Sequence, residues 1–132
     1  MQEVIPMLSY ENGIASLEWL NKEFGFEENT EMRFVEDGPL THSESKGDKD
    51  IIMIATPTTG FESINKQRKR DPLMDQWLTV PWIVNGLLVY VENLDEHFQS
   101  AKENVAEILS EIEEGFPGKR HRCAGIESHR WT

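Results

Sequence analysis

The last thirteen residues hold the densest group of side chains that could do chemistry. The segment RHRCAGIESHRWT, residues 120–132, contains three arginines, two histidines, a tryptophan and the only cysteine of the chain. Imidazoles and thiolates act as nucleophiles, general bases and ligands for borderline metal ions. The segment therefore raises three hypotheses: a nucleophilic centre, a metal site, or the end of a fold that carries no catalyst.

A nucleophilic centre would be built on Cys123 and His121, which are two residues apart and so share one face of a strand. The sequence contains no nucleophile elbow, no phosphate-binding glycine loop and no zinc-protease helix motif. A single cysteine is more often a buried, inert thiol than a reactive one. The sequence therefore favours an inert Cys123.

A metal site would draw on His42, His121, His129 and Cys123, but their spacing does not pre-organise a set of ligands. His42 and Glu44 alone share a strand face at close spacing, and two ligands seldom hold an ion. We therefore predict no metal ion and no other cofactor. The alternative role of these side chains is hydrogen bonding to neighbouring strands or to solvent.

The composition excludes several functional classes. The 132 residues suit one domain, and 24 acidic against 13 basic residues give a formal net charge of −11. This charge repels nucleic acid and anionic membranes, and no apolar run is long enough to span a bilayer. The lone cysteine and the lack of an export-signal pattern lead us to expect a cytoplasmic protein.

The first half of the sequence predicts a strand, a helix and three further strands. The helix is indicated by apolar residues at helical spacing between Asn12-Gly13 and Gly25. A short strand precedes it within EVIPMLSY. The later strands are expected through Phe34, through His42 and Glu44, and over Ile51–Ala55.

The second half repeats this pattern after a long connection, in which we expect about one helical turn. A strand over 83–91, an amphipathic helix and a strand over 106–112 follow residue 81. A shift of 81 positions lays Asn12 on Asn93 and Leu17 on Phe98. We therefore predict two quasi-repeated modules, with module one at about 3–56, a connection at 57–81 and module two at 82–132.

Four segments in this order resemble the glyoxalase/bleomycin-resistance/dioxygenase family of the vicinal oxygen chelate superfamily. They are IPMLSYENGIASLEWLNKEFGFEE, THSESKGDKDIIMIA, GLLVYVENLDEHFQSAKENVAEI and HRCAGIESHRWT. The resemblance implies an α+β fold of two βαβββ modules that form a cupped, mostly antiparallel sheet. It also implies a homodimer with ligand clefts.

Metal-dependent members of that family hold one divalent ion with His, Gln or Glu side chains at four strand positions. Carried over to this sequence, the positions fall at Ile5, Met53, Gly86 and Thr132. An alkyl chain, a thioether, a hydrogen and a neutral hydroxyl are poor ligands for such ions. The resemblance therefore points to a divergent member that lacks the metal ligands.

The candidate binding residues come from the predicted strand faces. On the strand over 83–91, Trp82 and Tyr90 flank Gly86, which we expect to leave open volume. Ser9 and Met53 are expected to point into the same space from module one, with His42 and Glu44 beside them. The alternative for Trp82 is packing in the core.

These observations favour a binding protein that holds a small organic molecule in a dimer cleft without a metal ion. A cationic, drug-like ligand is one hypothesis, and antibiotic resistance is one hypothesis for its purpose. The alternative is a metal-dependent lyase, isomerase or dioxygenase of the same superfamily. A third hypothesis is a non-catalytic domain that uses the fold only for dimerisation.

Overall fold

The computed structural model describes residues 2, 4–57, 60–80, 86–104, 106–115, 118–125, 127 and 129–132. The chain forms two compact units, Met1–Ser63 and Ile64–Thr132. Within the described ranges, no helix has the length and apolar character that a membrane span requires.

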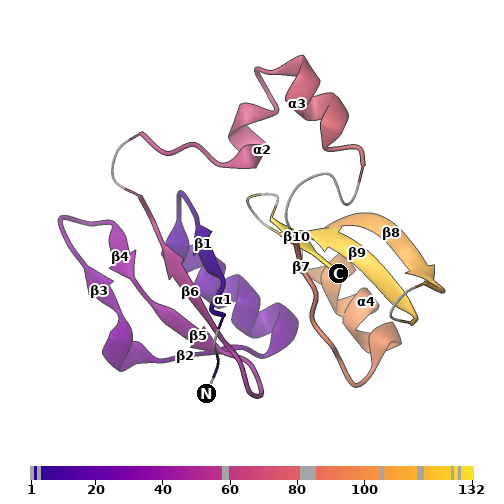
Figure 1. Cartoon of the computed structure of the whole chain (residues 1–132), viewed down its shortest axis with the longest axis horizontal. Helices are drawn as coiled ribbons and strands as arrows, with labels where there is room; N and C mark the ends of the chain where they lie inside the picture. Colours follow the sequence, from indigo (N-terminus) through magenta and orange to yellow (C-terminus); the bar gives the residue numbers. More distant parts are fainter. Residues whose placement is uncertain are drawn as a thin grey trace. The chain divides into compact units, whose positions relative to one another are not determined.

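The first unit is a four-stranded sheet with one long helix and a separate two-stranded sheet (Figure 1). The four-stranded sheet has the order β1-β6-β5-β2, in which β1 is parallel to β6 and the other neighbours are antiparallel. Strands β3 and β4 pair with each other. The elements are β1 (Met7–Ser9), α1 (Gly13–Phe24), β2 (Glu27–Glu28), η1 (Thr30–Met32), β3 (Phe34–Val35), β4 (Leu40–His42), β5 (Glu44–Lys46) and β6 (Ile51–Ala55).

Helix α1 begins and ends where the sequence indicates. The side chain of Asn12 accepts a hydrogen bond from the Ala15 backbone N–H, which satisfies a donor of the first turn. Gly25 ends the helix in the left-handed conformation at φ 70°, where glycine carries no side-chain penalty. Leu17 and Leu20 are buried on the inner face of the helix.

The second unit repeats this architecture after two short helices. Its sheet has the order β7-β10-β9-β8, in which β7 is parallel to β10 and the other neighbours are antiparallel. The elements are α2 (Ile64–Gln67), α3 (Pro72–Trp77), β7 (Gly86–Leu87), α4 (Leu94–Glu103), β8 (Glu107–Glu113), β9 (Arg120–Ala124) and β10 (Arg130–Trp131).

Equivalent contacts show that the two units are copies of one βαβββ plan. Asn93 caps α4 through the Glu96 N–H as Asn12 caps α1, and the two asparagines are 81 positions apart. Met53 donates its N–H to the Pro6 carbonyl at 2.9 Å, and Thr132 donates to Leu87 at 2.8 Å. The predicted α+β fold class is therefore confirmed.

Three details differ from the sequence prediction. The polar strand expected through His42 and Glu44 is divided at Ser43, because the Ser43 hydroxyl donates to the Ile54 carbonyl at 2.7 Å and the chain changes partner there. The connection contains two short helices rather than one turn, and Asp71 caps the second by accepting from the Leu73 and Met74 N–H groups. The strand expected over 106–112 is β8, displaced by one residue.

Candidate functional site

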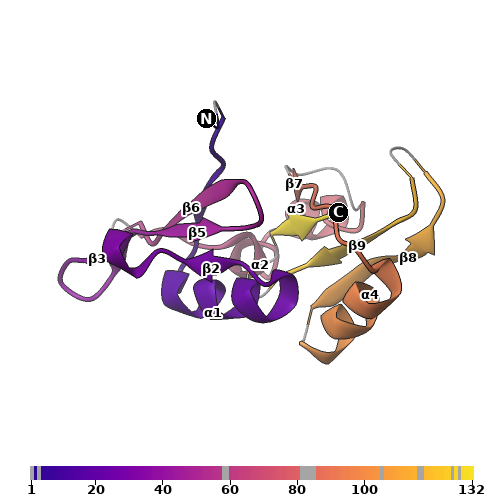
Figure 2. The ribbon, with the colours of Figure 1, turned by 90° about the horizontal axis from the view of Figure 1, so that it is seen from below.

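The sheet of the first unit has one face covered by α1 and one face without a helix (Figure 2). Ile52 and Ile54 are buried, whereas Met53 between them is half-buried. Met7, Met53 and Glu44 are paired in register across β1, β6 and β5, so their side chains form one row on the uncovered face. We call this surface the open face of the first unit. Ser9 lies on it too, two residues after Met7.

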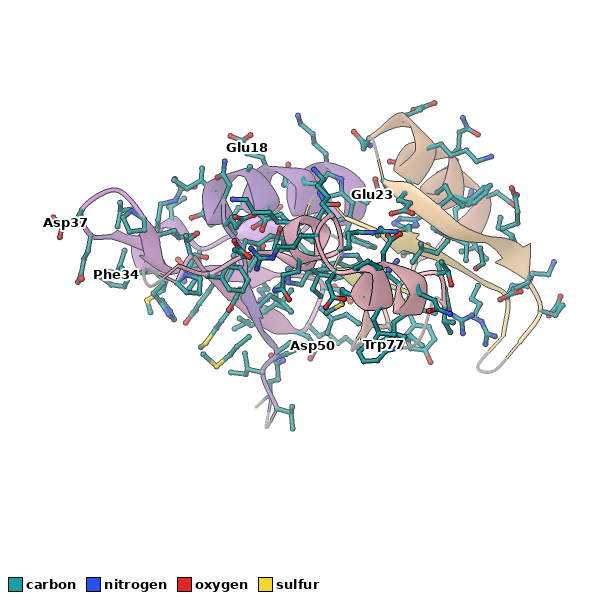
Figure 3. The ribbon with its side chains drawn as sticks, turned by 90° about the horizontal axis from the view of Figure 1, so that it is seen from above. Glu18, Glu23, Phe34, Asp37, Asp50 and Trp77 are labelled. Carbon is teal, nitrogen blue, oxygen red and sulfur yellow. The ribbon has the colours of Figure 1, made fainter. Side chains whose placement is uncertain are left out.

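A polar pair and an aromatic ring extend this row. The His42 Nε2 lies 3.4 Å from the Glu44 Oε1, and the His42 ring centroid lies 6.1 Å from that of Phe34. Phe34 is 51% exposed and Met7 is 78% exposed. Figure 3 shows Phe34 at the β3 end of this unit. The structure thus brings Ser9, Met53, His42 and Glu44 onto one surface, which has an apolar row and a polar pair.

The second unit also has a sheet face turned away from α4, on which Gly86 and Tyr90 lie. Helix α4 packs on the other face, where Phe98 meets His121 with ring centroids 5.1 Å apart (Figure 2). Side chains alternate along β7 and its extension, so Gly86, Leu88 and Tyr90 point away from α4. Tyr90 is 80% exposed. Trp82, the other aromatic candidate, lies outside the described residues.

The expectation of open volume at Gly86 is wrong. A Cβ atom built on Gly86 would lie 3.2 Å from both the Cβ and the carbonyl oxygen of Arg130, its partner on β10. The missing side chain instead permits close approach of the two strands. Gly86 therefore serves strand packing here, and its part in ligand binding stays a prediction.

Arg130 is the main residue of this face that the sequence interpretation missed. Its side chain is 3% exposed, and Nη2 donates to the Leu78 carbonyl at 3.0 Å. Burial lowers the pKa of the guanidinium, Glu107 raises it and Arg68 lowers it. No periodicity distinguishes such an arginine from a solvated one, because its burial depends on α3 and the strands that surround it.

His97 is the second residue that was missed. Its Nδ1 lies 2.8 Å from Nε2 of His121, and burial lowers the pKa of both imidazoles, that of His121 to about 4. His97 lies between Leu94, Phe98 and Ala101 at helical spacing, and this signal places it on the inner face of α4. His121 therefore pairs with His97, and the neighbouring Cys123 is a buried thiol, 1% exposed.

The four positions that the family resemblance assigns to a metal ion hold poor donors in this chain. The hydrogen bonds of Met53 and Thr132 give these residues equivalent places in the two units, next to Pro6 and Leu87. Their thioether and hydroxyl are poor donors, and Ile5 and Gly86 contribute none. Across the described ranges, no three or more His, Cys, Asp and Glu side chains are grouped to hold a metal ion.

Comparison with known proteins identifies the fold. No family model and no curated protein matches the chain. Solved structures match along its whole length, including TioX from Micromonospora sp. ML1, with 19% identity, 99% of this chain and 95% of that chain covered, and a TM-score of 0.67. A glyoxylase/bleomycin resistance protein/dioxygenase domain from Frankia sp. EAN1pec shares 12% identity, with a TM-score of 0.71. The match covers 99% of this chain and 94% of that chain.

A third match is a mutant of the fosfomycin resistance protein FosX from Listeria monocytogenes, complexed with Mn(II) and a dihydroxypropylphosphonic acid. It shares 14% identity, with 99% and 88% covered and a TM-score of 0.62. The chain thus has the glyoxalase/bleomycin-resistance fold that the sequence resemblance predicts. Identities this low establish the fold, and a fold by itself does not assign a ligand or a reaction.

Proposed function

We propose that this protein binds a small organic molecule without a metal ion and that it acts as a homodimer. The observation that carries the proposal is the open face of the first unit. Met7, Met53 and Phe34 offer apolar surface, and Glu44 and His42 are the polar groups among them. Small-molecule sites commonly combine an apolar lining with a few placed polar groups.

The names of the structural neighbours support the same function. The Listeria protein is named for fosfomycin resistance, and the Frankia domain for a family that includes bleomycin resistance. Because the four family metal positions lack good donors in this chain, binding is favoured over metal-assisted chemistry. Glu44 and the net charge of −11 make a cationic group one hypothesis for the ligand.

The test is a ligand screen that follows thermal unfolding, with calorimetry on each hit. Met53→Gln should weaken binding of a true ligand at least tenfold, because it places an amide on an apolar surface. Met74→Gln on α3 is the matched control, since Met74 is also half-buried but belongs to the other unit. Sedimentation of the purified chain checks the dimer.

Three results would contradict the proposal. A broad screen that finds no ligand would favour the third hypothesis, a non-catalytic domain that uses the fold only for dimerisation. Equal losses of affinity in Met53→Gln and Met74→Gln would remove the open face from the site. A monomer at the concentrations used in the screen would exclude the homodimer.

A metal-dependent lyase, isomerase or dioxygenase is the second candidate function. It is favoured by the contact of His42 and Glu44 at 3.4 Å and by the Mn(II) in the structure of the Listeria neighbour. Elemental analysis of protein purified without chelator tests it. Stoichiometric metal that is lost in both His42→Gln and Glu44→Gln would replace the metal-free proposal. Protein without bound metal, even after incubation with divalent ions, would exclude the enzyme.

A further inference from the structure

The guanidinium of Arg130 is a buried cation with unused donors. The side chain is 3% exposed, and one of its nitrogens, Nη2, donates to the Leu78 carbonyl at 3.0 Å. Within the described part of the chain, Nε and Nη1 are shielded from solvent and meet no hydrogen-bond acceptor. A buried charge is costly unless it is paired and hydrogen-bonded.

Glu107, the carboxylate that acts on the charge of Arg130, is engaged by another arginine. Arg68 Nε lies 2.9 Å from the Asp75 Oδ1, and Arg68 Nη1 lies 3.5 Å from the Glu107 Oε2. Glu107 and Arg130 both pair in register with Ala124, so they share the sheet face turned away from α4, on either side of a small residue. Arg68 therefore contacts both carboxylates, and Glu107 and Arg68 both act on the charge of Arg130.

We propose that Arg130 is the anchor of an oxyanion site, which holds a carboxylate or phosphate group through the donors of its buried guanidinium. Charge-assisted hydrogen bonds from arginine to these two groups are among the strongest in proteins. The site goes beyond the proposed function, because it belongs to the second unit and requires no contact with the open face of the first. Gly86 and Ala124, the in-register partners of Arg130, present no side chain longer than a methyl group beside it.

The oxyanion reaches Arg130 by moving the groups that cover it. Because Nε and Nη1 are shielded, and the Leu78 carbonyl caps Nη2, binding should disturb the peptide group between Leu78 and Thr79. A shift of Arg130 together with this peptide group would distinguish binding at the site from general screening of surface charges by salt. Screening acts on exposed pairs such as Arg33 and Glu28.

The experiment is a titration of the ¹⁵N-labelled full chain, observed by NMR at the arginine Nε–Hε groups. Inorganic phosphate and acetate are added separately at constant ionic strength, and chloride is the reference anion. Arg130→Lys identifies the Arg130 resonance by removing it. We expect a saturable shift of this resonance together with the Thr79 amide. A shift with phosphate alone would indicate a phosphate ligand, and a shift with acetate alone would indicate a carboxylate ligand. A shift with both anions would indicate a site that accepts either group.

Two neighbouring substitutions test the site in opposite directions, which a loss of folding cannot imitate. Glu107→Gln should strengthen oxyanion binding about fivefold, because it removes a competing negative charge. Arg68→Gln should weaken it about fivefold, because it removes a positive charge and releases two carboxylates. Arg33→Gln, on an exposed pair of the first unit, is the matched control and should leave the affinity unchanged.

The proposal is overturned if neither phosphate nor acetate shifts the Arg130 resonance saturably, or if chloride shifts it equally. It is also overturned if the Glu107 and Arg68 variants change the affinity in the same direction. None of these outcomes bears on the Met53→Gln result, so the anion site and the proposed function fail independently. The neighbouring variants keep Arg130, so the test stands even if Arg130→Lys does not fold.

Discussion

The imidazoles of His97 and His121 meet inside the second unit, with Nδ1 of the first 2.8 Å from Nε2 of the second. His97 comes from α4 and His121 from β9, and their ring centroids are 5.1 Å apart. The Phe98 ring meets His121 edge-on, and the Lys102 ammonium lies over the Phe98 ring at 4.2 Å from its centroid. Burial lowers the pKa of His121 to about 4, with a further contribution from His97.

This pair predicts a loss of stability in mild acid. The pKa of His121 is lower in the fold than the ordinary value near 6.5, so the unfolded chain takes up its proton first as the pH falls. The stabilisation is therefore complete above about pH 6.5 and is lost progressively toward about pH 4. We expect His121 to contribute a loss of about 2 to 3 kcal/mol in the free energy of unfolding, measured by urea denaturation.

His121→Gln separates this contribution from that of the many carboxylates. The amide keeps a hydrogen-bonding group opposite His97 but does not titrate. The variant should be less stable than the parent at neutral pH and should lose that disadvantage near pH 4.5. A His121→Gln curve parallel to that of the parent would contradict the prediction.

The helix caps carry a second prediction. Asn12→Ala and Asn93→Ala should each lower the free energy of unfolding by about 1 kcal/mol, because each leaves a first-turn N–H without its side-chain acceptor. Asn12→Asp and Asn93→Asp should restore most of the loss, since a carboxylate also accepts this bond. Urea denaturation of the four variants provides the measurement. Aspartate variants as unstable as the alanine variants would show that the caps do not act through this bond.

The features that the sequence predicts correctly are those set by local spacing. Asn12 and Gly25 fix the ends of α1 through bonds to residues within one helical turn. The repeat of Asn12 at Asn93, with Leu17 matched by Phe98, carries the same information into the second unit. Period and cap signals of this kind depend on neighbours in the chain, so they are visible before the fold is known.

The features that the sequence does not reveal depend on partners far along the chain. Ser43 divides the expected strand through a bond to Ile54 on another strand. Gly86 meets Arg130 because β7 and β10 are parallel neighbours, 44 positions apart in the sequence. A period of two assigns each residue to a face, but it does not state which side chain occupies the space beside it.

The exposed aromatic of the second unit gives a third prediction. Tyr90 is 80% exposed, so Tyr90→Ala should change the free energy of unfolding by less than about 0.5 kcal/mol. If a ligand found in the screen contacts this face, Tyr90→Ala should nevertheless weaken its binding. Trp77→Ala on α3, 46% exposed and visible in Figure 3, is the matched control and should leave binding unchanged. Equal effects of the two substitutions on affinity would remove Tyr90 from the site.

For Trp82→Ala, the sequence alone predicts a similar result. It should impair ligand binding more than it impairs folding, as calorimetry and thermal unfolding of the variant would show. A variant that fails to fold, with no binding defect in milder substitutions such as Trp82→Phe, would place Trp82 in the core instead.

Two neighbouring serines provide the last prediction, because both are buried but differ in one bond. Ser43 is fully buried and donates to the Ile54 carbonyl at 2.7 Å. Ser45 is 1% exposed, and within the described ranges its hydroxyl meets no partner. Ser43→Ala should therefore cost about 1 to 2 kcal/mol in the free energy of unfolding, since it removes the donor to a buried carbonyl.

Ser45→Ala should be neutral or stabilising, because it removes a buried hydroxyl that has no bond to lose. The two substitutions delete the same atom two residues apart, so the difference between their unfolding midpoints in urea isolates the bond to Ile54. Equal losses would show that the Ser43 bond is not what holds the chain between β4 and β5. A larger loss in Ser45→Ala would reverse the assignment and make Ser45 the bonded serine.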